Sequence, residues 1–213
     1  IEQIRAARAL KGWSQQELAE RTHTSQVTIA NIESGKSQGS ANTIKAIEST
    51  FQNSGVEFIE GGVKLSQNMI STIEGKDSFA HLLDDVFYTL RDVKDNKEVL
   101  IFGSDETRSP LAVNIAFKKL RDAGIKFRSL VAEGNHYLLG PLNEYRFIDK
   151  NAISGEAITI YSDKTAYAIE YKPYPTILLI NNKFIANDNR RLFEYFWSKG
   201  KLPTHTTAQE SYE

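Results

Sequence analysis

The sequence predicts two domains of different class: an all-α N-terminal domain that ends in a β-hairpin, and an α/β C-terminal domain. Residues 1–55 carry apolar positions at helical spacing, broken into short segments by capping residues and glycines. Beyond residue 77, apolar runs of strand length alternate with helical patterns, which is typical of βαβ units and a parallel sheet. The expected bounds are 1–66 for the N-terminal domain, 67–76 for a linker, 77–202 for the C-terminal domain and 203–213 for a mobile tail.

Four short helices are expected in the N-terminal domain. The first carries an apolar stripe and ends at Gly12. Ser14 caps the second, and Glu17, three residues later, completes a capping-box pattern. Ser25 caps the third helix, which ends at Gly35.

A fourth helix is predicted over about residues 41–54, with apolar side chains on one face. Two short apolar runs then flank Gly61 and Gly62, which predicts a β-hairpin. Residues 67–76 contain Ser, Asn and Gly between these runs and the next apolar helix pattern. They are therefore interpreted as a connector.

The second and third helices, joined by a three- or four-residue turn, form a helix-turn-helix pattern. The stretch "WSQQELAERTHTSQVTIANIESGK" resembles the DNA-binding domain of the phage-repressor-like (XRE) regulators, and the resemblance covers about residues 1–65. The matching positions are Gln15, Leu18, Ala19, Ser25, Ile29, Ile32, Glu33 and Gly35. His23 occupies the turn position that the family usually gives to Gly. Histidine tolerates positive φ better than most residues, so the turn is expected to persist.

The third helix presents short hydrogen-bonding side chains away from its apolar positions. Asn and Gln can bind adenine through two hydrogen bonds in the major groove, which Lys and Glu cannot imitate. Gln26, Thr28 and Asn31 are therefore predicted to read bases, with Val27 placed for thymine methyl groups. The alternative is a merely solvated polar face, which the family resemblance disfavours.

The resemblance also implies that Gln15, at the start of the second helix, holds a DNA phosphate. Arg8, Lys36 and Ser37 are further phosphate candidates. Residues 1–65 contain seven basic and seven acidic side chains, so a single domain should bind DNA weakly through charge. Useful affinity then requires two domains on one double-stranded DNA, which predicts a homodimer on a two-fold related operator.

The C-terminal domain is expected to begin with a helix at Asp77 and Ser78, followed by the strand "EVLIFG". A helix that starts near Pro110 and ends near Gly124 leads to the strand "IKFRSLVA", completing a parallel βαβ unit. Four more strand-like runs follow: "YRFID", "EAITIYSD", "TAYAIEY" and "TILLI". The last helix, about residues 184–199, is rich in Phe and Trp.

This order of elements resembles the effector domain of TrmB-type transcriptional regulators, which has a phospholipase D-like fold. Enzymes with that fold need a His-x-Lys-x4-Asp motif. The nearest histidine, His136, has Leu138 at the Lys position and Asn143 at the Asp position. The signature is absent, so the sequence predicts no catalytic residues and no enzyme.

Two loops follow the parallel strands and are candidates for an effector site, because ligands favour the carboxyl ends of strands in open α/β sheets. Their candidate residues are Ser104, Asp105, Glu106, Arg108, His136 and Tyr137. This mixture suits a small polar effector such as a sugar or nucleotide fragment, or an anion at Arg108. The alternative to an effector site is that these are two ordinary polar loops without a ligand. No partner at metal-ligand spacing supports a metal site.

Composition limits the function classes. The 213 residues include no cysteine, 25% charged side chains and a net charge of −1, and no apolar run reaches the roughly 20 residues that span a bilayer. The sequence therefore predicts a cytoplasmic regulator without a cofactor or a membrane partner, most simply a dimeric repressor. Two alternatives stay open: control by a protein partner, as in phage or mobile-element switches, and a phospholipase D-like phosphodiesterase or nuclease.

Overall fold

The computed structural model describes every residue except 1, 66–68, 154–155, 170–173 and 210–213. The chain divides into two compact units, residues 1–71 and 72–213. Each unit buries its own hydrophobic core, as expected of a domain.

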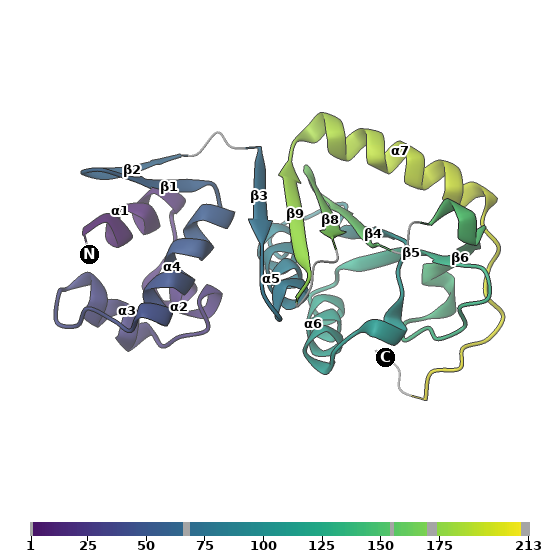
Figure 1. The fold of residues 1–213 in the computed structure, drawn as a ribbon, viewed down its shortest axis with the longest axis horizontal. Helices are drawn as coiled ribbons and strands as arrows, with labels where there is room; N and C mark the ends of the chain where they lie inside the picture. Colours follow the sequence, from purple (N-terminus) through teal and green to yellow (C-terminus); the bar gives the residue numbers. More distant parts are fainter. Residues whose placement is uncertain (1, 66–68, 154–155, 170–173, 210–213) are drawn as a thin grey trace. The chain divides into compact units, whose positions relative to one another are not determined.

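The N-terminal unit contains four helices and a two-stranded antiparallel hairpin (Figure 1). These are α1 Glu2–Lys11, α2 Gln15–Arg21, α3 Gln26–Glu33, α4 Ala41–Asn53, β1 Val56–Ile59 and β2 Gly62–Leu65. Serine caps begin three of the helices: the hydroxyls of Ser14, Ser25 and Ser40 each accept a hydrogen bond from a backbone N–H three residues later. The turn between α2 and α3 holds His23 at a φ of 50°, so the positive φ expected from the sequence is confirmed.

The core of this unit fixes α3 against the other helices. Ile29 and Ile32 of α3 are fully buried with Leu18 of α2. The ring of Trp13 stacks on Phe51 of α4 with centroids 5.3 Å apart. The inward side of α3 is therefore used for packing, and its other side is left for solvent or a partner.

The C-terminal unit is built on a seven-stranded mixed sheet in the order β3-β9-β8-β7-β4-β5-β6. Its strands are β3 Ile70–Ile73, β4 Glu98–Phe102, β5 Lys126–Ala132, β6 Tyr145–Ile148, β7 Ile158–Tyr161, β8 Lys164–Ile169 and β9 Thr176–Asn181. Its helices are α5 Ser78–Leu90, α6 Leu111–Asp122 and α7 Lys183–Lys199, and short 3-10 turns cover Glu106–Arg108, Leu142–Glu144 and Lys150–Ala152.

The three helices cover the two faces of this sheet (Figure 1). α5 and α6 pack on one face over a core that includes Leu82 and Val99. α7 packs on the other face, where Phe193 meets Leu100 and Ile160. Strands β4, β5 and β6 run parallel, whereas β4, β7, β8 and β9 pair antiparallel in turn. The predicted fold class, a helical domain followed by an α/β domain, is confirmed.

Two expected segments differ from the structure. The connector contains strand β3, whose Ile73 is buried in the sheet core while Ile70 is exposed. This "ISTI" run has the β-branched residues that favour strands, but it is short and half polar, which hid it in the sequence. The expected mobile tail is also corrected, because its residues as far as Thr207 are held by hydrogen bonds that are described below.

Candidate nucleic-acid interface and ligand pocket

The outward side of α3 carries the residues that the sequence assigned to base reading. Gln26 is exposed and Val27 has 68% of its surface exposed, while Thr28 and Asn31 are half-buried. The Thr28 hydroxyl lies 2.8 Å from that of Ser25, so it belongs to the cap of the helix as well as to its surface. The structure therefore brings all four residues together on one short helix.

Arg8 and Gln15, two of the predicted phosphate contacts, both form hydrogen bonds to Glu33 of this helix. The Arg8 guanidinium donates to both carboxylate oxygens of Glu33, at 2.8 and 3.1 Å, and to the Trp13 carbonyl at 2.8 Å. The Gln15 amide donates to the same carboxylate at 2.8 Å. A bidentate arginine–carboxylate pair is strong and directional, so these side chains tie α1 and α2 to the end of α3.

Electrostatics support this assignment. The Glu33 side chain is only 3% exposed. Burial alone would raise its pKa, but the hydrogen bonds from Arg8 and Gln15 outweigh burial and hold the pKa of Glu33 below its ordinary value. The hydrogen bond to Glu33 likewise raises the pKa of Arg8. The carboxylate therefore stays charged and paired at neutral pH.

The other two phosphate candidates follow α3 on the surface. Lys36 and Ser37 are both exposed. The Ser37 backbone N–H donates to the Asn31 carbonyl at 3.1 Å, and its hydroxyl accepts from the Gly39 N–H, also at 3.1 Å. This small hydrogen-bonded loop holds both residues next to the C-terminal end of the reading helix, where a phosphate contact is sterically open.

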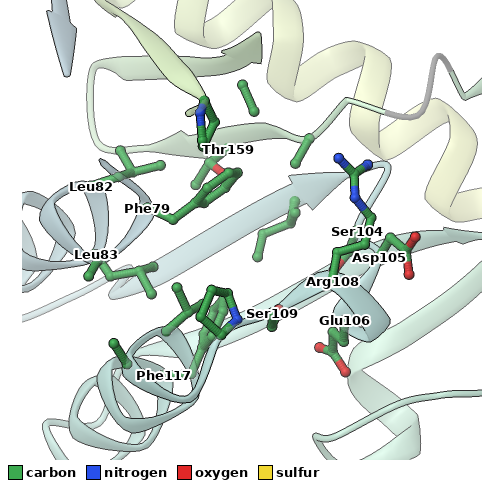
Figure 2. A pocket seen from close by; sticks show the side chains of 18 of the residues that line it. Phe79, Leu82, Leu83, Ser104, Asp105, Glu106, Arg108, Ser109, Phe117 and Thr159 are labelled. Atoms are coloured by element: carbon green, nitrogen blue, oxygen red, sulfur yellow. The ribbon is translucent and has the colours of Figure 1, made fainter. Parts of the chain in front are cut away.

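A cavity of about 320 Å³ lies in the C-terminal unit, between the sheet and the helices α5 and α6. The loop after β4 lines it with Ser104, Asp105, Glu106 and Arg108. Figure 2 shows the side chains of Asp105 and Arg108 at one end of the cavity. At the other end lie the apolar side chains of Phe79, Leu82, Leu83 and Phe117.

This apolar wall was not part of the predicted site. Phe79 and Leu82 lie at helical spacing, and spacing alone cannot distinguish a core position from a cavity wall. Glu156 and Thr159, from the segment around β7, also line the cavity and were not predicted. They reach it because β7 pairs with β4 antiparallel, a pairing that the sequence did not specify.

Glu106 lines the cavity but uses its carboxylate elsewhere. It accepts a hydrogen bond from the Tyr145 hydroxyl at 2.7 Å and another from the Leu139 backbone N–H. Burial raises the pKa of Glu106, and burial with the neighbouring carboxylate raises the pKa of Tyr145. Glu106 therefore anchors the loop that contains Leu139, and both of its carboxylate oxygens are already used in hydrogen bonds within the protein.

His136 and Tyr137 do not line the cavity, which corrects the predicted grouping. The His136 ring instead stacks on His205 with centroids 4.3 Å apart. The Thr207 backbone N–H donates to the His136 carbonyl at 2.8 Å, and the Thr206 hydroxyl donates to the Leu138 carbonyl at 2.7 Å. This pairing with residues 136–138 is the reason that the C-terminal segment is docked as far as Thr207.

The two loops after β4 and β5 still meet. The Asn135 side-chain amide donates to a carboxylate oxygen of Asp105 at 3.2 Å. This hydrogen bond joins the two loops at the carboxyl ends of the parallel strands β4 and β5. The cavity lies between the sheet and the helices α5 and α6, whereas His136 contacts the C-terminal segment. No helix within the described ranges is long and apolar enough to cross a membrane.

Comparison with known proteins supports the N-terminal interpretation. Residues 4–58 match the model of a helix-turn-helix family. No curated protein matches the chain. The helix-turn-helix identity of the N-terminal unit is therefore confirmed, and it covers the surface formed by α3.

Among solved structures, the chain is similar to TrmBL2, described as an archaeal chromatin protein with a novel mode of DNA binding, at 13% identity and a TM-score of 0.40. That match covers 66% of this chain, which spans only 56% of the TrmBL2 chain. Nuc, a phospholipase D family member from Salmonella typhimurium, matches at 10% identity with a TM-score of 0.46, covering 63% of this chain and 95% of Nuc. NucT from Helicobacter pylori matches at 11% identity and a TM-score of 0.45, covering 63% and 98%.

These neighbours correct one prediction. The sequence predicted that the chain is not an enzyme, because the phospholipase D signature is missing around His136. The similarity to Nuc, a phospholipase D family member, and to NucT contradicts that prediction.

Proposed function

We propose that the chain is a sequence-specific transcription regulator that binds double-stranded DNA as a dimer and acts as a repressor in the cytoplasm. The observation that carries the proposal is the outward face of α3, where exposed Gln26 and Val27 stand beside half-buried Thr28 and Asn31. The match of residues 4–58 to a helix-turn-helix family supports it. In such motifs the second helix enters the major groove and its N-terminal residues contact base edges.

The chemistry of this face fits base reading. The side-chain amides of Gln26 and Asn31 can each donate to N7 and accept from N6 of adenine. Val27 offers a methyl surface for thymine. The buried network around Glu33 holds α3 rigid, which limits the entropy that is lost when the helix enters the groove.

Base substitution in the operator tests this assignment. Gln26→Ala should cost about 1–3 kcal/mol of binding free energy and relax the preference at one base position. Gln52→Ala, on an exposed site of α4, is the matched control and should leave affinity unchanged. The measurement is fluorescence anisotropy with a panel of operators changed one base pair at a time. An equal loss on every operator would show that Gln26 does not read a base.

Dimeric binding follows from charge. Residues 1–65 of the N-terminal domain contain seven basic and seven acidic side chains, so their net attraction for DNA phosphates is small. One domain alone should therefore bind DNA weakly. Two linked domains on adjacent half-sites gain affinity because the second contact is intramolecular. A full operator should therefore bind far more tightly than a single half-site, and equal affinities would contradict the dimer.

The cavity of the C-terminal unit is proposed as an effector site. Because its far end is walled by Phe79, Leu82 and Phe117, it suits a small molecule with an apolar body and a polar or charged end near Asp105 and Arg108. This revises the purely polar effector that the sequence suggested. Such a ligand affects DNA binding only if it distinguishes two conformations of the regulator.

A thermal-shift panel of small aromatic and aliphatic acids, amines and sugars tests the site. A hit should lose its stabilising effect in Ala80→Phe, which fills the apolar end, and weaken in Arg108→Ala. Lys118→Glu, on the exposed side of α6, serves as the control. A hit that binds both cavity variants as well as it binds wild type would place the ligand elsewhere.

A further inference from the structure

We propose that the outer face of α7 is the dimer interface, pairing with the same face of a second copy of this chain in antiparallel orientation. The proposal rests on the dimer proposed above and names the surface that forms it. Its observations come only from α7, Lys183–Lys199, and from the side of the sheet that this helix covers.

The inner face of α7 is already used. Ala186 and Phe193 are fully buried against the sheet core formed by Leu100 and Ile160. Arg128 of β5 donates to both carboxylate oxygens of Glu194, and these hydrogen bonds fix the position of α7 across the sheet. The rotation of α7 about its axis is therefore set, and so is the identity of the face that points away from the sheet.

That outer face carries large apolar side chains that nothing in the described part of the unit covers. Phe184 is 80% exposed and Tyr195 is 61% exposed, and Leu192 and Ile185 are exposed beside them. Figure 1 shows α7 as the outermost layer of its unit. Single exposed apolar residues are ordinary, but four on one face of one helix mark an interaction surface.

The spacing of this face is that of a coiled-coil seam. Phe184, Asp188, Arg191 and Tyr195 follow one another at intervals of four, three and four residues, the alternation that keeps one helix face turned toward a partner. In this order the two aromatic rings lie at the ends of the seam. The acid and the base lie at its centre.

The seam is complementary to itself. A two-fold axis midway between positions 189 and 190 places Phe184 opposite Tyr195 of the partner subunit. The same axis places Asp188 opposite Arg191 of the partner subunit, and each contact occurs twice, as an isologous interface requires. Within one helix, Asp188 and Arg191 already lie 3.5 Å apart and are 74% and 83% exposed, so both charges are accessible to a partner.

The flank of the seam agrees with this arrangement. Ile185 and Leu192 lie seven residues apart on the same side of the seam. In the antiparallel pair, Ile185 lies beside Leu192 of the partner subunit, and Leu192 lies beside Ile185 of the partner subunit. A parallel pair would instead set Asp188 against Asp188 and Arg191 against Arg191, so the charges select the antiparallel orientation.

Charge reversal tests the pairing without disturbing the fold, because both charged side chains are exposed. The full chain is studied by sedimentation equilibrium without DNA. Asp188→Arg and Arg191→Asp should each weaken dimerisation at least about tenfold, since each sets like charges against each other at the centre of the interface. The double variant D188R/R191D restores opposite charges across the two-fold axis and should recover the wild-type dissociation constant.

The control is Lys118→Glu, a reversal of the same size on an exposed position of α6, which should not change dimerisation. A wild-type monomer, a dimer that ignores both single reversals, or a double variant as weak as the singles would each overturn the proposal. A monomer would also result if this face covered another part of the same chain.

Failure of this interface and failure of the proposed function are separable. The monomeric Asp188→Arg variant should bind a single operator half-site as wild type does, while its gain on the full operator is lost. If the wild-type protein dimerises through α7 but binds no DNA, the proposed interface is supported and the proposed function as a transcription regulator is contradicted.

Discussion

Each unit buries one glutamate beneath its candidate site, and the two carboxylates are held in opposite ways. Glu33 is paired with a guanidinium and an amide, and its pKa is held below the ordinary value. Glu106 is held by a tyrosine hydroxyl and a backbone N–H, and burial raises its pKa. Beneath α3 the protein keeps a charge and neutralises it with a cation. At the cavity, burial disfavours the charged form of the Glu106 carboxyl group and raises its pKa.

The difference shows how each region is built for its task. A helix that enters DNA must hold its orientation against a polyanion, and an ion pair across α1, α2 and α3 fixes that orientation. Beside the cavity, Glu106 is instead held by hydrogen bonds from the Tyr145 hydroxyl and the Leu139 backbone N–H.

The largest effect is expected from Glu33→Ala. Removing one partner of a largely buried ion pair leaves Arg8 uncompensated and should lower the free energy of unfolding by about 3 kcal/mol. The measurement is urea unfolding followed by Trp13 fluorescence in a Trp197→Phe background, which isolates the N-terminal unit.

Glu57→Ala is the control, because Glu57 belongs to an exposed pair with Lys64 and should change stability by less than about 1 kcal/mol. The double variant Glu33→Ala/Arg8→Ala should lose less than the sum of the two single variants, since removing both partners leaves no unpaired charge. Strict additivity would mean that the ion pair is not the source of the loss.

A smaller effect is expected from Glu106→Ala. It leaves the Leu139 N–H and the Tyr145 hydroxyl without their acceptor and should cost about 2 kcal/mol, the usual penalty for buried unpaired donors. Urea unfolding followed by Trp197 fluorescence in a Trp13→Phe background measures it. Glu133→Ala, which removes an exposed pair with Lys201, should be close to neutral. Equal losses in the two variants would deny Glu106 its role as an anchor.

The two units also differ in how far the sequence could predict them. In the N-terminal unit the serine caps, the turn at His23 and the outward-facing residues of α3 follow from local patterns. Short helices are specified largely by residues that are close to one another in the sequence. The role of Arg8 could not be predicted, since its partner Glu33 lies 25 residues away. Only the tertiary packing of α1 on α3 reveals that the two meet.

In the C-terminal unit the helices and every described strand except β3 were predicted, and so was the parallel pairing of β4 with β5, but the other pairings of β4 and β5 were not. The antiparallel pairing of β7 with β4 brings Glu156 and Thr159 to the cavity, and no local pattern specifies it. The docking of Thr206 and Thr207 on residues 136–138 was missed for the same reason: the contacts are long-range and polar. Hydrophobic periodicity carries no information about them.

The smallest effect, and the sharpest comparison, is the dependence of stability on pH. The folded pKa of Glu33 lies below its ordinary value of 4.5, so its contribution is complete above pH 4.5 and is lost as the pH falls through the folded pKa. The folded pKa of Glu106 lies above 4.5, so its contribution is complete below pH 4.5 and is lost as the pH rises through the folded pKa. The two glutamates therefore give slopes of opposite sign.

The free energy of unfolding of each unit, followed by its own tryptophan from below pH 4.5 to neutrality, measures both slopes. Glu33→Gln should remove part of the acid loss from the N-terminal unit, because a neutral amide has no proton to gain. Glu106→Gln should remove part of the loss on the neutral side from the C-terminal unit. Each variant is compared with wild type at every pH, so that titration of other groups cancels. Slopes of the same sign in the two differences would show that the two carboxylates are held alike, and the contrast between Glu33 and Glu106 would fail.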